Sequence, residues 1–504
     1  MRRKKIDPEL PILLPFVPGP ASNGEYIPRE RSAAHELMAA LAFECADEIA
    51  HKQRIDRRRF LAGVGGIAVT LAAINAVACG DSGDGKKRAT PGGTFQVPTD
   101  GDPEAVCKML EGDEFIFDVQ THHVNPNNPP GAALAGFFES VHPGCDLPNQ
   151  VDCFGRYQYL KDVFLDSDTS MAVLSDTPSP DDNVDPLTFE EMRQTLEIID
   201  MLSSGGASRL QLHSIVVPNV GTVQAQLDLM QARAETLHVA AWKVYTPYAG
   251  DTGGWFLDDE QLGIPMIEKA RELGVKRIAA HKGLPLFGFD VSYASPRDIG
   301  VVAKAYPDVE FVVYHSGWDP GGGAEGPWDP DGADHGVNRL IKSLKDNGVA
   351  PNSNVWAELG STWRGIMSEP TQAAHVLGKL LTHVGEDRVI WGTDCVWYGA
   401  PQPQIVAFRT FQIDSEFRDQ YGYPELTPEL KAKVFGLNAA QLYAVDADAQ
   451  RCALDRDELE QIREAYRDAD LDSHELKWQP HAPITRREML THAFAQGGLW
   501  SPWR

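Results

Sequence analysis

Three apolar stretches decide the fold: VAAWKVY at residues 239–245, RIAAH at 277–281 and FVVYH at 311–315. Short runs of this composition between amphipathic segments are typical of buried strands in a parallel sheet. Five similar runs lie at 115–119, 171–174, 210–217, 355–359 and 389–391. Eight strands that alternate with helices are what a (β/α)8 barrel requires. We therefore predict an α/β protein with a TIM-like barrel, preceded by a signal and linker and followed by a C-terminal helical extension.

Helix signals between these runs support the alternation. Thr188 and Glu191 form a capping box, Ser295-Pro296 is a helix start, and an apolar stripe over residues 337–344 is followed by Gly348. These stripes predict helices that pack against the barrel.

The charge balance restricts the class of partner. The chain of 504 residues has 46 Lys and Arg against 72 Asp and Glu, a net charge of −26. Nucleic-acid binding needs a basic surface, so we expect no nucleic-acid partner. Residues 1–59 hold 11 basic and 9 acidic residues and are therefore slightly basic. The remaining residues carry a net charge of −28.

This N-terminal region has the anatomy of an export signal. The basic sequence DRRRFL at 56–61 opens an apolar stretch over 60–78 that ends at Cys79. It resembles a twin-arginine signal, and AVAC at 76–79 resembles a lipobox. The resemblance implies a signal region over 1–79, a lipid anchor at Cys79 and a place on the periplasmic side of a bacterial cell envelope. A single membrane-spanning helix is the alternative interpretation.

The rest of the chain divides into three parts. Residues 80–112 are rich in Gly, Asp, Thr and Pro and predict a flexible linker. The barrel is expected over 113–445, and 446–504 form the C-terminal extension. Cys145 and Cys153 are either a disulfide in an oxidising envelope or ordinary thiols, and both interpretations stay open.

Polar residues at strand ends are the candidates for chemistry, because TIM-barrel active sites lie at the carboxyl ends of the strands. These residues are Gln120 and His122 after the first run, Lys243 near the end of the fourth, His281 and His315 at the fifth and sixth, and Asp394 after the eighth. Imidazole nitrogens and a carboxylate from separate strands suit a divalent metal such as zinc, which activates water or polarises a carbonyl group.

Five motifs occur in order: DVQTH at 118–122, AHK at 280–282, YHSG at 314–317, WGTD at 391–394 and LNAAQLY at 437–443. Together they resemble the amidohydrolase superfamily, in the branch that includes aminocarboxymuconate-semialdehyde decarboxylase. The resemblance implies one zinc or manganese ion held by His122, His281 and Asp394. It implies His315 and Asp394 as acid and base, and a homodimer. Gln120 stands where the family has its first ligand His, and a Gln carbonyl is a weaker, uncharged ligand.

Three further residues are candidates for substrate contact. Lys243 lies where some superfamily members carry a carboxylated lysine between two metals, but a plain cation that binds a substrate carboxylate is the favoured interpretation. Trp318 and Trp397 form either an aromatic wall around the substrate or ordinary loop anchors.

Three functions follow. The first is a metal-dependent hydrolase that cleaves an ester, lactone or amide of a small molecule. The second is a non-oxidative decarboxylase of a small carboxylic acid, aromatic acids included, at the same metal site. The third is a non-catalytic binding protein of the envelope, and the presence of His122, His281, His315 and Asp394 together argues against it.

Overall fold

The structure is a computed structural model. It describes residues 14–24, 26–79, 91–98, 112–141, 147–179, 184–203, 207–236, 238–284, 289–321, 323–332, 334–454, 458–468, 486–487 and 489–490.

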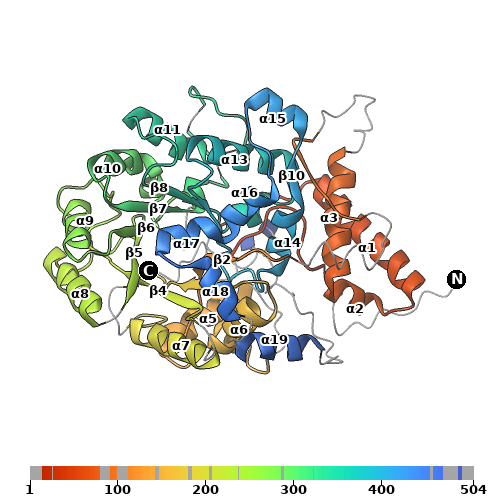
Figure 1. The fold of residues 1–504 in the computed structure, drawn as a ribbon, viewed down its shortest axis with the longest axis horizontal. Helices are drawn as coiled ribbons and strands as arrows, with labels where there is room; N and C mark the ends of the chain where they lie inside the picture. The colour runs from red at the N-terminus through yellow and green to blue at the C-terminus, as the bar shows by residue number, and fades with distance from the viewer. Residues whose placement is uncertain are drawn as a thin grey trace.

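Eight parallel strands form one sheet in chain order, as the eight apolar runs predict (Figure 1). They are β2 (Phe117–Thr121), β3 (Met171–Leu174), β4 (Leu210–Ile215), β5 (Val239–Tyr245), β6 (Arg277–His281), β7 (Glu310–Tyr314), β8 (Val355–Glu358) and β9 (Val389–Ile390). The first and last strands meet, because the Val119 amide donates to the Trp391 carbonyl at 3.1 Å and Thr121 forms a parallel bridge with Cys395. The sheet is therefore a closed (β/α)8 barrel.

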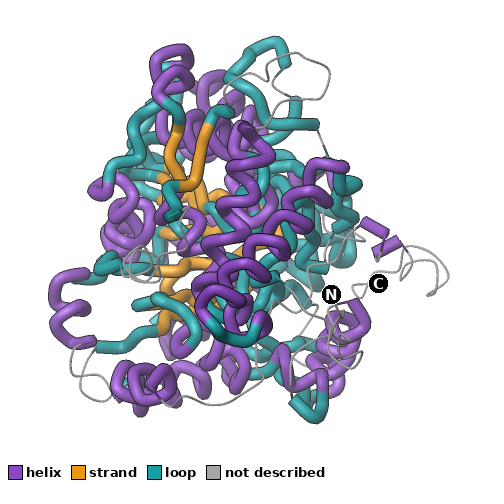
Figure 2. Tube along the Cα trace, turned by 90° about the vertical axis from the view of Figure 1, so that its right-hand side faces the viewer, coloured by secondary structure: helices purple, strands orange, loops and turns teal. Residues whose placement is uncertain are grey.

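Helices cover the outside of the barrel (Figure 2). They are α5 (Pro129–Val141), α6 (Arg156–Leu160), α7 (Phe189–Leu202), α8 (Val223–Thr236), α9 (Gly263–Glu272), α10 (Ile299–Ala305), α11 (Asn338–Asn347), α12 (Thr362–Ile366), α13 (Pro370–His383), α14 (Gln402–Thr410), α15 (Ser415–Tyr421), α16 (Pro428–Ala432) and α17 (Asn438–Tyr443). The predicted capping box at Thr188 is present, and Gly348 ends α11 in the left-handed conformation. Local sequence signals thus set these helix ends.

Inward-facing side chains fill the barrel. Val119, Val173, Ala241 and Val312 form one buried cluster, to which α17 adds Tyr443. Because apolar side chains fill the interior, the polar groups gather at the ends of the strands.

The N-terminal region is part of the folded body. Its helices are α1 (Ala33–Gln53), α2 (Arg57–Ala62) and α3 (Val64–Cys79), and they lie together beside the barrel (Figure 1). Ile67, Leu71 and Ile74 on α3 are fully buried in the same apolar cluster as the barrel residues. The twin-arginine-like sequence thus starts α2, and its apolar stretch forms a core helix. Export and the lipid anchor stay predictions.

No helix in the described part of the chain is long and apolar enough to span a membrane. Cys79 is a free, exposed thiol at the end of α3.

Part of the segment expected to be a linker has regular structure. β1 (Gly93–Phe95) pairs antiparallel with β10 (Phe411–Ile413), which follows α14. The Asn75 side chain on α3 exchanges two hydrogen bonds with the backbone of Phe95. The chain after α3 is therefore fixed to the barrel at this point.

The C-terminal extension packs on the barrel where it is described. α18 (Ala447–Leu454) and α19 (Glu458–Asp468) follow α17, and Arg463 forms a 2.5 Å ion pair with Asp168. Cys153 is disulfide-bonded. Cys145, its expected partner, lies outside the described residues.

Candidate active site

The strand ends bring the candidate residues together inside the barrel mouth. Gln120, His122, Lys243, His281, His315 and Asp394 are each no more than 2% exposed. A cluster of ionisable side chains this deeply buried is costly unless each has a partner. The partners therefore define the chemistry of the site.

Asp118 of the DVQTH motif builds the frame. One of its carboxylate oxygens accepts from the backbone amides of Gln120, at 3.1 Å, and Thr393, at 3.0 Å, while the Thr393 hydroxyl donates to the other. Burial raises the pKa of Asp118 to about 7, although the Thr393 hydrogen bonds lower it. Asp118 thus ties β2 to the turn that presents Asp394.

Asp394 and His122 form the first pair. His122 Nε2 lies 3.4 Å from Asp394 Oδ1, which also accepts from Gln120 Nε2 at 2.9 Å. Asp394 Oδ2 accepts from Ser361 Oγ and, at 3.0 Å, from Asn23 Nδ2. Burial raises the pKa of Asp394, but the hydrogen bond and charge of His122 outweigh it and hold the pKa well below its usual range.

His281 and His315 form the second pair. His315 Nε2 lies 3.2 Å from His281 Nδ1, while the opposite nitrogens donate to the carbonyls of Gly360, at 2.8 Å, and Leu284, at 2.9 Å. Burial lowers the pKa of His315 to about 4 and that of His281 well below its usual value. Both rings are therefore neutral and present lone pairs to each other.

The donor set fits a divalent cation, although the described His, Cys, Asp and Glu side chains include no preformed group of three or more ligands. His122 Nδ1 bonds the Ser175 carbonyl at 2.8 Å, which leaves Nε2 available as a ligand atom. Two ligand atoms about 2.1 Å from one ion would lie about 3.4 Å apart, which is the distance between His122 Nε2 and Asp394 Oδ1. The buried Oε1 of Gln120 accepts no hydrogen bond from the described residues and is a further possible oxygen ligand.

The backbone at the site is strained. Among the described residues, seven non-glycine residues have a positive φ, and four of them are His315, Ser316, Ser361 and Asp394. Such conformations cost about 1–3 kcal/mol each and gather at functional sites. These four residues follow β7, β8 and β9. The backbone conformation therefore indicates a functional site at this end of the barrel, independently of the side chains.

Lys243 lies within β5, two residues before the end of the strand. Its Nζ is 3.1 Å from the centroid of the Tyr314 ring and 4.9 Å from that of Tyr245. It is close enough to His281 and His315 that its charge lowers the pKa of both. Lys243 therefore supplies positive charge near the histidine pair.

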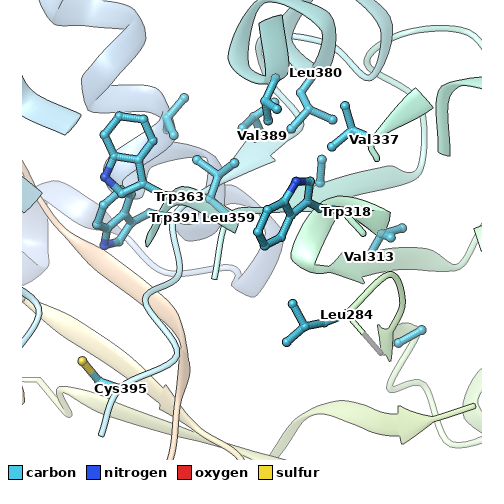
Figure 3. Close-up of a cluster of buried hydrophobic side chains, with 14 of the residues drawn as sticks. Leu284, Val313, Trp318, Val337, Leu359, Trp363, Leu380, Val389, Trp391 and Cys395 are labelled. Atoms are coloured by element: carbon cyan, nitrogen blue, oxygen red, sulfur yellow. The ribbon is translucent and has the colours of Figure 1, made fainter. Parts of the chain in front are cut away.

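The two tryptophans have different neighbours. The Trp397 ring stacks on Phe138 at 4.1 Å and lies 5.9 Å from the His122 ring, beside the site. Trp318 packs among Leu284, Val313 and Val337 (Figure 3). Its contacts are those of a loop anchor, so only Trp397 lies against a proposed ligand.

The structure adds residues that the sequence analysis missed. Glu358 at the end of β8 accepts from the backbone amides of His315, at 2.9 Å, and Gly360. Burial raises its pKa to about 8, although these amides lower it. A charged residue within an apolar strand was an available signal for Glu358. No local pattern pointed to Ser361 or Asn23.

His122 and His123 take opposite sides, as strand alternation predicts. His123 Nε2 lies 3.0 Å from Thr195 Oγ1 on α7, outside the barrel.

Residues 213–445 match the model of an amidohydrolase family. The match contains His281, His315 and Asp394, whereas Gln120 and His122 precede it. No curated protein matches the chain.

Three solved structures are similar to the chain at low identity. A 5-carboxyvanillate decarboxylase from Sphingomonas paucimobilis is 14% identical with a TM-score of 0.41, over 66% of this chain and all (100%) of that one. A 5-carboxyvanillate decarboxylase from Novosphingobium aromaticivorans, with manganese and 4-hydroxy-3-methoxy-5-nitrobenzoic acid, is 12% identical with a TM-score of 0.40, over 66% and 97%. A 2,6-dihydroxybenzoate decarboxylase complexed with 2,6-dihydroxybenzoate is 13% identical with a TM-score of 0.39, over 66% of this chain and 100% of that one.

Proposed function

We propose that this protein is a metal-dependent, non-oxidative decarboxylase of a small aromatic carboxylic acid. The same reaction class is named for the three solved structures above. This proposal reverses the order of the first two functions expected from the sequence, which put hydrolysis first.

The observation that carries the proposal is the closure of the site. His122, His281, His315 and Asp394 are at most 2% exposed. The buried Trp397 ring lies 5.9 Å from the His122 ring, and the buried Tyr398 hydroxyl lies 3.1 Å from Ser361, which bonds Asp394. Hydrolysis consumes a water molecule, whereas decarboxylation consumes one proton and benefits from the exclusion of water. Aromatic rings beside His122 suit a flat, apolar substrate ring.

Lys243 and His315 have different roles in the proposed decarboxylation. Lys243 supplies the positive charge that favours a substrate carboxylate. His315 donates its Nδ1 hydrogen to Gly360, so Nε2 carries the lone pair. In each turnover Nε2 takes up one proton from the solvent and delivers it to the ring carbon bearing the carboxylate. The bond from that carbon to the carboxylate then breaks, its electron pair returns to the ring, and carbon dioxide leaves. The product carries hydrogen where the carboxylate was.

A divalent ion, zinc or manganese, would be held by His122, His281, Asp394 and Gln120, and when bound it supplies Lewis acidity toward the substrate oxygens. Glu358 and Gly360 hold the backbone and ring of His315 in place. Asp394 orients His122 and shares in proton transfer.

A metal-dependent hydrolase is the second candidate. The amidohydrolase model over residues 213–445 favours it. The substrate would then be an ester, lactone or amide of a small molecule.

One experiment separates the candidates. Purified protein loaded with manganese or zinc is incubated in D2O with aromatic carboxylates and, in parallel, with esters, lactones and amides. The decarboxylase releases carbon dioxide and places one deuterium at the carbon that lost the carboxylate. Hydrolysis without carbon dioxide release establishes the second candidate, and metal binding with no turnover of either set favours a binding protein. His315→Ala is the inactive control.

The proposal includes a location in the bacterial cell envelope. The disulfide at Cys153 supports an oxidising compartment.

A further inference from the structure

A segment far from the barrel in sequence reaches the centre of the site. We call residues 14–32 the N-terminal segment. Ser22 and Asn23 within it have no exposed surface. Leu14, Phe16 and Tyr26 are also buried, and Phe16 and Tyr26 belong to the main apolar cluster. The segment is thus packed into the protein along most of its described length.

Asn23 makes the contact that matters. Its Nδ2 donates to Asp394 Oδ2 at 3.0 Å, across 371 residues of chain. The other oxygen of the same carboxylate, Oδ1, faces His122 Nε2 and Gln120 Nε2. The two oxygens of Asp394 therefore have separate partners, and Asn23 helps to fix which oxygen points toward the proposed cation.

The turn that carries Asn23 is built for this position. Ser22 Oγ donates to the Tyr26 carbonyl at 2.6 Å and accepts from the Gly24 amide at 2.9 Å. Asn23 therefore lies at the tip of a turn closed by its own hydrogen bonds. A buried amide held so firmly loses little further freedom when it binds the carboxylate.

Two arginines fix the segment to the barrel loops. Arg29 donates to the carbonyls of Pro320 and Gly323, in the loop that follows β7 and His315. Arg364, after β8, donates to the Val17 carbonyl at 3.3 Å. The segment is thus held by the loop that follows β7 and by α12, which follows β8.

We propose that Asn23 is a positioning residue of the active site, through which the N-terminal segment orients Asp394 for the divalent cation. The inference rests on the proposed metal dependence, but not on the choice between decarboxylation and hydrolysis. Outer partners of ligating groups commonly change metal affinity by about 10- to 100-fold when they are removed. By linkage, if the docked segment strengthens cation binding, the cation strengthens docking by the same factor.

The test uses the full chain, stripped of metal and titrated with Mn2+ in a calorimeter. Asn23→Leu keeps the side-chain volume and removes the donor, and Asn23→Ala removes both. The matched control is Glu30→Gln, an exposed position of the same segment. Thermal melting in the absence of metal shows whether each variant is folded. Hydrogen exchange of the wild-type segment, with and without Mn2+, gives a measurement that depends on no variant.

We expect Asn23→Leu and Asn23→Ala to weaken Mn2+ binding by about 10- to 100-fold, with the control unchanged, and Mn2+ to slow exchange in the wild-type segment. A folded variant with wild-type affinity, or wild-type exchange that Mn2+ does not alter, overturns the inference. A lower melting temperature with unchanged affinity assigns Asn23 a purely structural role and also overturns it.

The outcomes for the proposed function remain distinct. If the wild type binds no Mn2+, the metal-dependent function and this inference fail together. If it binds Mn2+ and Asn23→Leu weakens binding, but no carboxylate is decarboxylated, only the proposed reaction fails. If the wild type decarboxylates and the Asn23 variants bind Mn2+ normally, only the inference fails.

Discussion

His281 Nδ1 and His315 Nε2 face each other at 3.2 Å, and each ring uses its other nitrogen to donate to a backbone carbonyl. Two lone pairs at this distance repel unless a proton or a cation lies between them. The pair is therefore arranged for a positive species, although its two members have different proposed roles.

Replacing each histidine separates these roles. His315→Ala should lower kcat by about 10²- to 10⁴-fold, the usual contribution of a general acid, and leave metal content nearly unchanged. His281→Ala should lose the metal. Metal analysis and steady-state kinetics on the same preparations check both expectations, with His123→Ala as a control outside the barrel. Loss of metal from His315→Ala would make it a ligand.

Gln120→His should tighten metal binding. Gln120 donates a hydrogen bond from Nε2 to Asp394, and no described residue donates to its Oε1, so the present side chain contributes at most a neutral oxygen. An imidazole at this position offers a stronger ligand atom. Calorimetric titration with Zn2+ should show a lower Kd than for wild type, and an unchanged Kd would place residue 120 outside the ligand set.

Ile74→Ala should destabilise the whole protein by about 2–5 kcal/mol, because it leaves a cavity in the main apolar cluster. Chemical denaturation followed by tryptophan fluorescence measures the loss. Ala76→Ser, at an exposed position of the same helix, should have almost no effect. Equal stability of both variants would mean that α3 contributes nothing to the folded state.

The raised pKa of Asp162 predicts that the stability of the protein depends on pH. Burial raises its pKa to about 7, with a smaller opposing effect of Lys161. Between the ordinary value of 3.8 and about 7 the folded protein binds more protons than the unfolded chain, so stability falls as pH rises through this window. Asp162→Asn removes this loss, which is at most about 4 kcal/mol.

The melting temperature of Asp162→Asn should therefore rise relative to wild type between pH 5 and pH 8, values chosen to lie about this window. Asp419→Asn, on the surface of α15, serves as the control. A difference that stays constant with pH would contradict a raised pKa for Asp162.

The barrel and half of the site follow from local sequence patterns. Apolar runs place the eight strands within a few residues of their observed bounds, because a strand buried on both faces must be apolar throughout. His281, His315 and Asp394 were found because strand ends meet at one end of such a barrel.

The remaining features depend on contacts that no local pattern encodes. Asn23 lies in a segment without periodicity, and its partner is 371 residues away. The apolar stretch of α3 is compatible with an export signal and with a buried helix, because both require apolar side chains. Only the packing of α3 in the folded protein shows that it is a buried helix there.

The separation of Asn23 from Asp394 also has a consequence in time. At about 5–20 residues per second, a ribosome needs tens of seconds to make the 371 residues between them. Until residues 370–410 have been made, α3 lacks α13 and α14, against which it finally packs. During synthesis the nascent chain therefore displays an apolar helix behind a run of arginines. The same helix is accessible to targeting factors and chaperones while the chain grows, and it is hidden from them once the barrel closes.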